Sequence, residues 1–221
     1  MKLQVYSACF YSDSTPAKRL VESCERFGLP LTLYGVGETF QNWYHAKVIR
    51  LREELEKSDA DIVLYTDAAD SWFLHADSFV EKFNRFDTRL VVSSERNCWP
   101  DGSLHSKFRP DIGSYRYPCA GQFIGYRESI LTMFDAFAGL DYGHNDQAYW
   151  LKVMADRWLD AKVDSHCILF QTMDSERLDE TMQKCLGRLL NVETSTMPCL
   201  VHFNGGSKHE RIAEFDRWFN G

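Results

Sequence analysis

Two aspartates separated by two alanines, Asp67 and Asp70, follow a short apolar run at residues 62–65. A run of β-branched and aromatic residues bounded by acids is typical of a buried parallel strand. Ligands of open α/β sheets bind beyond the carboxyl ends of the strands, and carboxylates there can hold a divalent cation through oxygen. The structural alternative is that Asp67 ends the strand and Asp70 caps a following helix.

A second group of chemically capable residues occupies positions 202–208, after the last predicted strand. His202 could supply a nitrogen ligand to the cation held by Asp67 and Asp70, and a carboxylate–imidazole set suits Mn²⁺ better than Ca²⁺. The two glycines of this segment would let backbone N–H groups approach phosphate oxygens, and Lys208 would neutralise them. A structural role for the histidine is the competing interpretation.

Two further groups stand at places where active-site residues are often found. Asn145 and Asp146 open a predicted helix, where either could cap the first turn and where Asp146 could also act as a base or anchor a sugar hydroxyl. Trp99 lies in an irregular segment at 95–118. Its ring could stack on a sugar face or pack the loop onto the core, and loops of this length inside compact domains are usually functional.

The elements that must position these residues alternate along the chain. Strand patterns occur at 3–10, 31–34, 62–65, 90–94, 122–126, 167–170 and 198–203, and helical patterns at 16–27, 46–57, 77–83 (with Asp77 as cap), 129–137, 145–154, 179–190 and 212–219. Strand–helix alternation predicts an α/β fold with a mostly parallel sheet covered on both faces. We expect one domain over 1–221, with a nucleotide-binding half at 1–95 and an acceptor half with a metal-binding C-terminal segment at 96–221.

Composition excludes several classes of function. A net charge of −7 without a Lys/Arg cluster argues against a nucleic-acid partner. The chain has no G-x-G-x-x-G after its first strand and no P-loop motif, which argues against dinucleotide enzymes and P-loop NTPases. No apolar run reaches the roughly 18 residues of a membrane span. Seven cysteines without a C-x-x-C pair suit a reducing compartment, so we expect a cytoplasmic protein. The oligomeric state is not predicted.

Six motifs follow one another in a recognisable order. The Asp-x-x-Asp strand end is followed by 93–100 (SSERNCWP), 121–125 (GQFIG), 145–147 (NDQ), 170–171 (FQ) and 201–205 (VHFNG). In this order and with these gaps, the chain resembles the glycosyltransferase domain of the procollagen lysyl hydroxylase (PLOD) family and the related collagen galactosyl- and glucosyltransferases. The likeness extends from the first strand to about Lys208.

The resemblance implies a GT-A-type, Rossmann-like fold, a UDP-sugar donor and a Mn²⁺ cofactor, with Mg²⁺ as the alternative. In that family the two acids and the histidine after the last strand ligate the metal, and these positions match Asp67, Asp70 and His202. With the motif positions, the predicted donor-binding residues are Tyr6, Lys47, Asp67, Asp70, Trp99, Gly121, Gln122, Asn145, Asp146, Asn204, Gly205 and Lys208.

The chain departs from the family pattern at three places, one of which is the acid-rich run before Asp-Gln, reduced here to residues 143–146 (GHND). Ala69 stands where the family usually has an aromatic residue that stacks on uracil, so either Trp43, Tyr44 or Tyr6 would stack in its place or the base would be held differently. Residues 119–122 read CAGQ where the family has Asn-Ser-Gly-Gly. The metal and diphosphate positions are retained, whereas the positions that recognise the base and the sugar differ.

The predicted function is metal-dependent transfer of a hexose, galactose or glucose, from a UDP-sugar to a hydroxyl group of hydroxylysine or of a glycan. Asp146 is the predicted base if transfer inverts the anomeric centre, and it orients the sugar if transfer retains it. The departures at Ala69 and Cys119 motivate an alternative, a non-catalytic sugar-nucleotide- or glycan-binding module. A phosphohydrolase or nucleotidyltransferase would use the same acids but attack at phosphorus.

Overall fold

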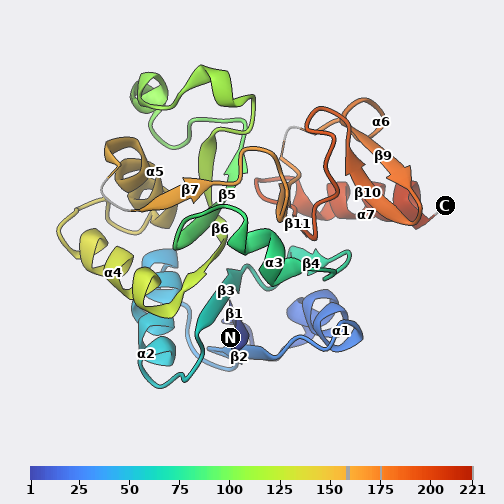
Figure 1. Cartoon of the computed structure of the whole chain (residues 1–221). Coiled ribbons are helices and arrows are strands. Elements are labelled where there is room, and N and C mark those ends of the chain that lie inside the picture. The colour runs from blue at the N-terminus through green and yellow to red at the C-terminus, as the bar shows by residue number, and fades with distance from the viewer. Residues whose placement is uncertain (158–159, 175, 221) are drawn as a thin grey trace.

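A mixed sheet forms the centre of the molecule. The computed structural model describes residues 1–157, 160–174 and 176–220. Six strands pair in the order β2 (Leu31–Tyr34), β1 (Leu3–Ala8), β3 (Ile62–Thr66), β6 (Tyr117–Tyr126), β5 (Leu90–Glu95) and β7 (Ala161–Val163) (Figure 1). β1 is parallel to β2 and β3, and β5 is parallel to β7. β6 runs antiparallel between β3 and β5, and the α/β fold with a mixed, mostly parallel sheet is confirmed.

One face of this sheet is covered by α2 (Arg50–Glu56), α4 (Arg127–Ala138) and α5 (Asp146–Asp156), which lie together at the left of Figure 1. Successive side chains of a strand point to opposite faces, and Val63, Tyr65 and Phe123 point to this one. They pack there against aromatic residues of the helices, such as Phe137 and Trp150. The predicted helix at 46–57 begins with a π-helical segment, His45–Ile49, and continues as α2.

The other face carries α1 (Lys18–Arg26) and α3 (Phe79–Asn84). Ile62 and Leu64, which alternate with Val63 and Tyr65 along β3, point to this side. Their partners include Leu20 of α1 and Phe79 and Phe83 of α3. Both faces of β3 are therefore buried, as its unbroken apolar run predicts.

A second, three-stranded sheet carries the C-terminal part of the site. β11 (Leu200–His202) lies between β4 (Ser71–Phe73), to which it is antiparallel, and β8 (Phe170–Thr172), to which it is parallel. The long C-terminal helix α7 (Lys208–Asn220) packs beside this sheet through Phe215, whose ring contacts Trp72 and Phe203. The three-stranded sheet therefore places β11 beside the turn that follows β3.

The helix predicted at 179–190 is wrong. Only α6 (Leu178–Thr181) is helical, and it is followed by a hairpin of β9 (Met182–Cys185) and β10 (Arg188–Asn191) at the right of Figure 1. Leu186 and Gly187 both have positive φ, at 53° and 75°. A two-residue loop of this kind matches the twist of an antiparallel pair and ends any helix.

Several predicted element boundaries also change. Asp77 does not cap α3, since the N-cap residue is Ser78 and Asp77 pairs with Arg188. Asp70 caps no helix, because β4 follows it directly. The strand predicted at 167–170 lies at Phe170–Thr172, and the short edge strand β7 was not predicted. A strand of three residues leaves too little period-2 signal for its position to be predicted.

The long segment predicted as irregular contains two short 3₁₀ turns, Gly102–Lys107 and Pro110–Ile112, and ends where β6 begins at Tyr117. A further 3₁₀ turn, Thr15–Ala17, precedes α1. In the part of the chain that the structure describes, no helix has the length and apolar character needed to cross a bilayer. A single domain over 1–221 stays a prediction.

Candidate active site

The turn from Asp67 to Asp70 connects the two sheets. The Asp67 N–H donates to the Gly121 carbonyl of β6 over 3.0 Å, and the Phe203 N–H donates to the Asp70 carbonyl over 2.8 Å. The Ser71 hydroxyl bonds the Thr66 hydroxyl at 2.6 Å across the base of the turn. The two carboxylates are thereby held at the point where the six-stranded and three-stranded sheets meet.

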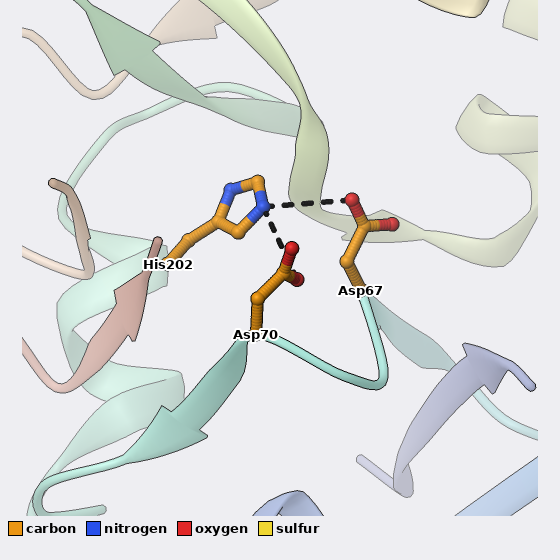
Figure 2. Close-up of side chains that lie close together, drawn as sticks. All are labelled: Asp67, Asp70 and His202. Carbon is orange, nitrogen blue, oxygen red and sulfur yellow. Dashed lines mark ion pairs between the residues drawn. The ribbon is translucent and has the colours of Figure 1, made fainter. Parts of the chain in front are cut away.

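His202 reaches this turn because β11 pairs with β4, with His202 opposite Ser71. Its Nε2 atom lies 3.5 Å from Asp67 Oδ2 and 3.6 Å from Asp70 Oδ1. Figure 2 shows the imidazole facing both carboxylates, which stand at the two ends of the turn. One ligand atom from each of the three residues lies within 4.8 Å of the others. The structure thus brings His202 to two acids that lie 132 and 135 positions earlier in the chain.

Gly121 makes room for the imidazole. A Cβ atom at this position would lie 2.0 Å from Cε1 of His202, far inside van der Waals contact. The Sγ atom of Cys119, also on β6, lies 3.8 Å from Nδ1 of the same ring. β6 therefore provides a close-fitting wall, and only a glycine at position 121 leaves the ring where it can face both acids.

Two lysines pair with these carboxylates. Lys47 Nζ lies 2.9 Å from Asp67 Oδ1 and 3.0 Å from Asp146 Oδ2, while Lys208 Nζ lies 3.0 Å from Asp70 Oδ2. Lys47 is buried and stands in the π-helical segment before α2. Single π turns inside helices are frequent at functional sites, and this one aims a buried ammonium group at two acids.

The pKa values reflect these contacts. Burial acts to raise the pKa of Asp67, but the Lys47 charge and the His202 hydrogen bond outweigh it and hold the pKa below the ordinary range. Burial acts to lower the pKa of His202, but its contact with Asp67 and the Asp70 charge raise it well above the ordinary value. The Asp146 and Asp67 charges likewise raise the pKa of Lys47 against its burial. The cluster is a network of opposite charges, each stabilised by the others.

The start of α5 forms another wall of the site. The Asn145 side chain accepts a hydrogen bond from the Ala148 N–H and caps the helix. The Asp146 carboxylate is therefore not the cap and pairs with Lys47 instead. The next side chain, Gln147, accepts from the Ala120 N–H at 2.6 Å and donates to Glu95 at 2.9 Å. Gln147 therefore fastens α5 to β6 and positions Asp146.

Glu95 is a site residue that the sequence analysis missed. It ends β5, is 7% exposed, and accepts from Gln147 and, over 3.3 Å, from the Asn204 amide. Burial, reinforced by the charge of Asp174, raises its pKa to about 8. Like Asp67, Glu95 is an acid at the carboxyl end of a strand. Its place at a strand end would therefore have identified it from the sequence.

These residues line one open pocket of about 1100 Å³. The predicted site residues that line it are Lys47, Asp67, Asp70, Trp99, Gly121, Asn145, Asp146, His202, Asn204, Gly205 and Lys208. Two predicted residues do not line the pocket. Tyr6 is buried with its hydroxyl on Ser58. Gln122, next to Gly121 on β6, points to the opposite face, where its amide donates to Thr66. Strand alternation turns both side chains away from the pocket.

Aromatic side chains gather at two parts of the pocket wall. Phe10, Phe40 and Trp43 line it near the end of β1, and the Phe40 and Trp43 rings are 4.8 Å apart. Trp43 is 48% exposed, and the Lys47 ammonium lies 5.0 Å from its ring centroid. Trp99, 54% exposed, lines the pocket from the long segment before β6. Flat apolar surfaces are therefore available in the same pocket as the charged cluster.

The donor set fits a divalent cation. Two carboxylates and an imidazole are ligands that Mn²⁺ and similar ions accept, and the close wall at Gly121 holds the imidazole toward the acids. Among the described residues, Asp67, Asp70 and His202 form the group of at least three His, Cys, Asp or Glu side chains that lie close enough to share an ion. Lysines on either side can neutralise a phosphorylated ligand at the same place.

Comparison with known proteins gives a consistent result. A family model described as the PLOD GT domain matches residues 8–218. The chain is 28% identical to the procollagen-lysine,2-oxoglutarate 5-dioxygenase of Drosophila melanogaster over 92% of its length. It is 26% identical over 86% to the multifunctional procollagen lysine hydroxylase and glycosyltransferase LH3 of Homo sapiens. The chain covers only 31% and 28% of these two relatives.

A solved structure shares the fold. It is the crystal structure of a glycosyltransferase involved in the glycosylation of the major capsid of PBCV-1, with a TM-score of 0.59 and 13% identity. The match covers 98% of this chain and 100% of that one. The predicted GT-A-type arrangement of a mixed sheet flanked by helices is thereby confirmed.

Proposed function

The chain belongs to the family of the PLOD glycosyltransferase domain, and from this premise we propose that it transfers a hexose from a UDP-sugar to a hydroxyl acceptor with the help of a divalent metal. The observation that carries the proposal is the convergence of Asp67, Asp70 and His202 in a pocket that also holds Lys47 and Lys208. Neither the two sheets nor the core requires this concentration of charge.

Asp67, Asp70 and His202 would hold the metal, with Mn²⁺ as the proposed ion and Mg²⁺ as the alternative. A bound ion would supply Lewis-acid stabilisation of the diphosphate leaving group. Since such an ion requires a neutral imidazole, His202 must give up the proton that the two carboxylates favour. We therefore expect metal binding to release a proton.

The diphosphate is proposed to lie between the charged cluster and the turn that starts α7. Lys208 is the first residue of that helix and points its ammonium group to the cluster. Gly205 has φ of +89°, a conformation that favours glycine, and a Cβ there would lie 2.5 Å from Asp174 Oδ1. The Asp174 carboxylate therefore fills the space beside Gly205, whereas the space that a Cβ of Gly206 would occupy is open. A phosphate could approach the backbone at Gly206, and Lys208 would stabilise the charge that develops on the leaving group.

The aromatic group at the end of β1 is proposed to hold the uracil base. Ala68 and Ala69 leave this part of the pocket wall without a ring of their own. Phe40 and Trp43 line the same pocket and are about half exposed, so their faces are free to stack on a base, an interaction worth about 1–3 kcal/mol. They would replace the aromatic residue that the family usually has at position 69.

Asp146 is the proposed catalytic residue. It lines the pocket beside Lys47, on the wall that also holds Asn145. If transfer inverts the anomeric centre, its carboxylate accepts the proton of the acceptor hydroxyl as the new glycosidic bond forms and the UDP bond breaks. If transfer retains the configuration, Asp146 orients the donor sugar. Trp99, exposed on the pocket wall, is proposed to pack on a sugar face.

The hexose is proposed to be galactose or glucose, as the resemblance to collagen galactosyl- and glucosyltransferases implies. The acceptor is proposed to be a hydroxylysine or glycan hydroxyl, because the human relative LH3 is a multifunctional procollagen lysine hydroxylase and glycosyltransferase. A cytoplasmic location and the absence of a nucleic-acid partner remain proposals; all seven cysteines are free thiols. The oligomeric state is left open.

A second candidate function is a sugar-nucleotide- or glycan-binding module without turnover. Cys119 favours it, because this residue contacts His202 where the family has an asparagine near the transferred sugar. Such a module would bind the donor in the same pocket but release no UDP.

The test is turnover of a panel of UDP-sugars with and without Mn²⁺, read as UDP release. Asp67→Ala, Asp70→Ala and His202→Ala are each expected to lower Mn²⁺-dependent turnover at least 100-fold, since each removes a metal ligand. Asp59→Ala, at a surface aspartate whose side chain is 83% exposed, is the matched control and should retain full activity.

Near-normal turnover in the three variants would contradict the assignment of the metal site. Release of UMP instead of UDP would indicate attack at phosphorus, as in a phosphohydrolase or nucleotidyltransferase. Tight donor binding without any turnover across the panel would favour the binding module.

A further inference from the structure

The carboxylates that could hold the metal are already engaged by lysines. Asp67 offers both oxygens to Lys47, at 2.9 and 3.0 Å, and Asp70 offers Oδ2 to Lys208 at 3.0 Å. All four side chains lie in or beside the pocket, and the Asp67, Asp70 and Lys47 side chains are at most 19% exposed. Ion pairs with so little solvent are screened far less than surface pairs.

A cation and a lysine compete for such a carboxylate. A divalent ion bound to Asp70 would stand next to the Lys208 ammonium group, and like charges at this distance repel strongly in a partly buried site. The same holds for Asp67 and Lys47. The metal can therefore bind tightly only when the lysines have another negative partner.

A diphosphate is such a partner. Lys208 begins α7 directly after the turn that contains Gly205 and Gly206, and its side chain is 31% exposed, so it has room to move. Lys47 is enclosed, with a side chain 9% exposed, and is held by Asp67 and Asp146 together. Of the two lysines, Lys208 is the one that can change partners while the fold stays intact.

From these contacts we propose that Lys208 couples the binding of the metal to the binding of the diphosphate. Without a donor, Lys208 occupies Asp70 and opposes the cation. When the diphosphate enters, Lys208 transfers to a phosphate oxygen and releases Asp70 for the metal. The two ligands thus favour each other through this lysine, in addition to any direct contact between them. The proposal rests on the proposed function, because it takes the same cluster as the metal and donor site.

By thermodynamic linkage this coupling is reciprocal. UDP raises the affinity for Mn²⁺ by the same factor by which Mn²⁺ raises the affinity for UDP. A lysine that only bound phosphate would contribute to UDP affinity but would leave the affinity for Mn²⁺ alone unchanged. The affinity for the metal in the absence of nucleotide is therefore the measurement that separates the two roles.

The experiment is isothermal titration of Mn²⁺ into the metal-free full chain, with and without saturating UDP, for the wild type, Lys208→Met and Lys208→Gln. We expect both variants to bind Mn²⁺ alone at least about fivefold more tightly than the wild type, the lower range of typical coupling factors. We expect them also to show a smaller gain in affinity on addition of UDP. Lys18→Met removes the same charge from an exposed pair with Glu22 and should change neither value.

The outcomes are distinct. If the wild type binds both Mn²⁺ and UDP but the Lys208 variants bind Mn²⁺ alone with less than a fivefold gain, the coupling proposal is overturned and the proposed function stands. If the wild type binds neither Mn²⁺ nor UDP, the proposed function itself fails. Two variants of different polarity at a partly exposed helix start keep the result independent of one substitution's effect on folding.

Discussion

Replacement of Glu95 by glutamine is expected to lower the free energy of unfolding at acidic pH and to raise it at alkaline pH. Burial and the charge of Asp174 raise the pKa of Glu95 to about 8, from 4.5 in an unstructured chain, although His202 opposes this. Between these two values the folded state holds a proton that the unfolded state has lost. The free energy of unfolding therefore falls as pH rises from about 4.5 to about 8.

The size of the effect follows from the two pKa values. A difference of about 3.5 between them corresponds to at most about 5 kcal/mol. Glutamine cannot ionise, so Glu95→Gln removes this loss. It also places an amide NH₂ group beside the amides of Gln147 and Asn204, both of which donate to Glu95, and one lost hydrogen bond costs about 1 kcal/mol. The variant should be about 1 kcal/mol less stable at pH 4, of nearly equal stability at pH 5, and about 2–4 kcal/mol more stable at pH 9.

The assay is urea unfolding of the metal-free protein from pH 4 to pH 9, with the wild type and the variant measured in the same buffers. Glu25→Gln, at an exposed position of α1, is the control and should follow the wild type throughout. Curves for Glu95→Gln and the wild type that stay parallel over this range would refute the reasoning, because they would show that Glu95 does not change its protonation on folding.

Two further substitutions test the architecture around the site. Gly121→Ala should weaken Mn²⁺ binding more than tenfold while the circular dichroism spectrum is retained, because a Cβ 2.0 Å from His202 must displace the imidazole. Mn²⁺ affinity is measured by titration calorimetry. An unchanged affinity would show that the imidazole is not needed at that place. Arg96→Met should lower the free energy of unfolding by about 3–5 kcal/mol, because it removes the guanidinium whose Nε lies 2.7 Å from the buried Glu176 carboxylate and leaves that charge only the Tyr115 hydroxyl. In urea unfolding the double variant with Glu176→Gln should recover much of that loss. Equal stability of all three proteins would contradict the role of this pair.

The sequence alone was sufficient for the core of the fold. The unbroken apolar run of β3 predicted a strand buried on both faces, and the structure shows it covered by helices on both sides. The acids after β3 and the histidine of β11 were found because strand ends carry ligands in α/β sheets. These predictions depend on local periodicity and on residue type, both of which can be read along the chain.

Other features depended on contacts that no local pattern reveals. The hairpin at 182–191 carries residues of good helical propensity, and its strand pairing overrode that propensity at the turn with two positive φ angles. Tyr6 and Gln122 lie on predicted strands, but which face of each strand lines the pocket is decided by how the strands pair. Their neighbours in space, Ser58 and Thr66, are more than 50 residues away in the chain.

The sequence by itself determined which residues could hold a cation and a diphosphate, because carboxylates, imidazole and lysines keep their chemistry wherever the chain places them. Only the tertiary structure decided that Lys47 and Lys208 pair with the acids and that Gly121 makes room for His202. It also decided that Glu95 is buried beside them with a raised pKa. Distance and burial set the strength of charge interactions, and both arise only when distant segments pack together.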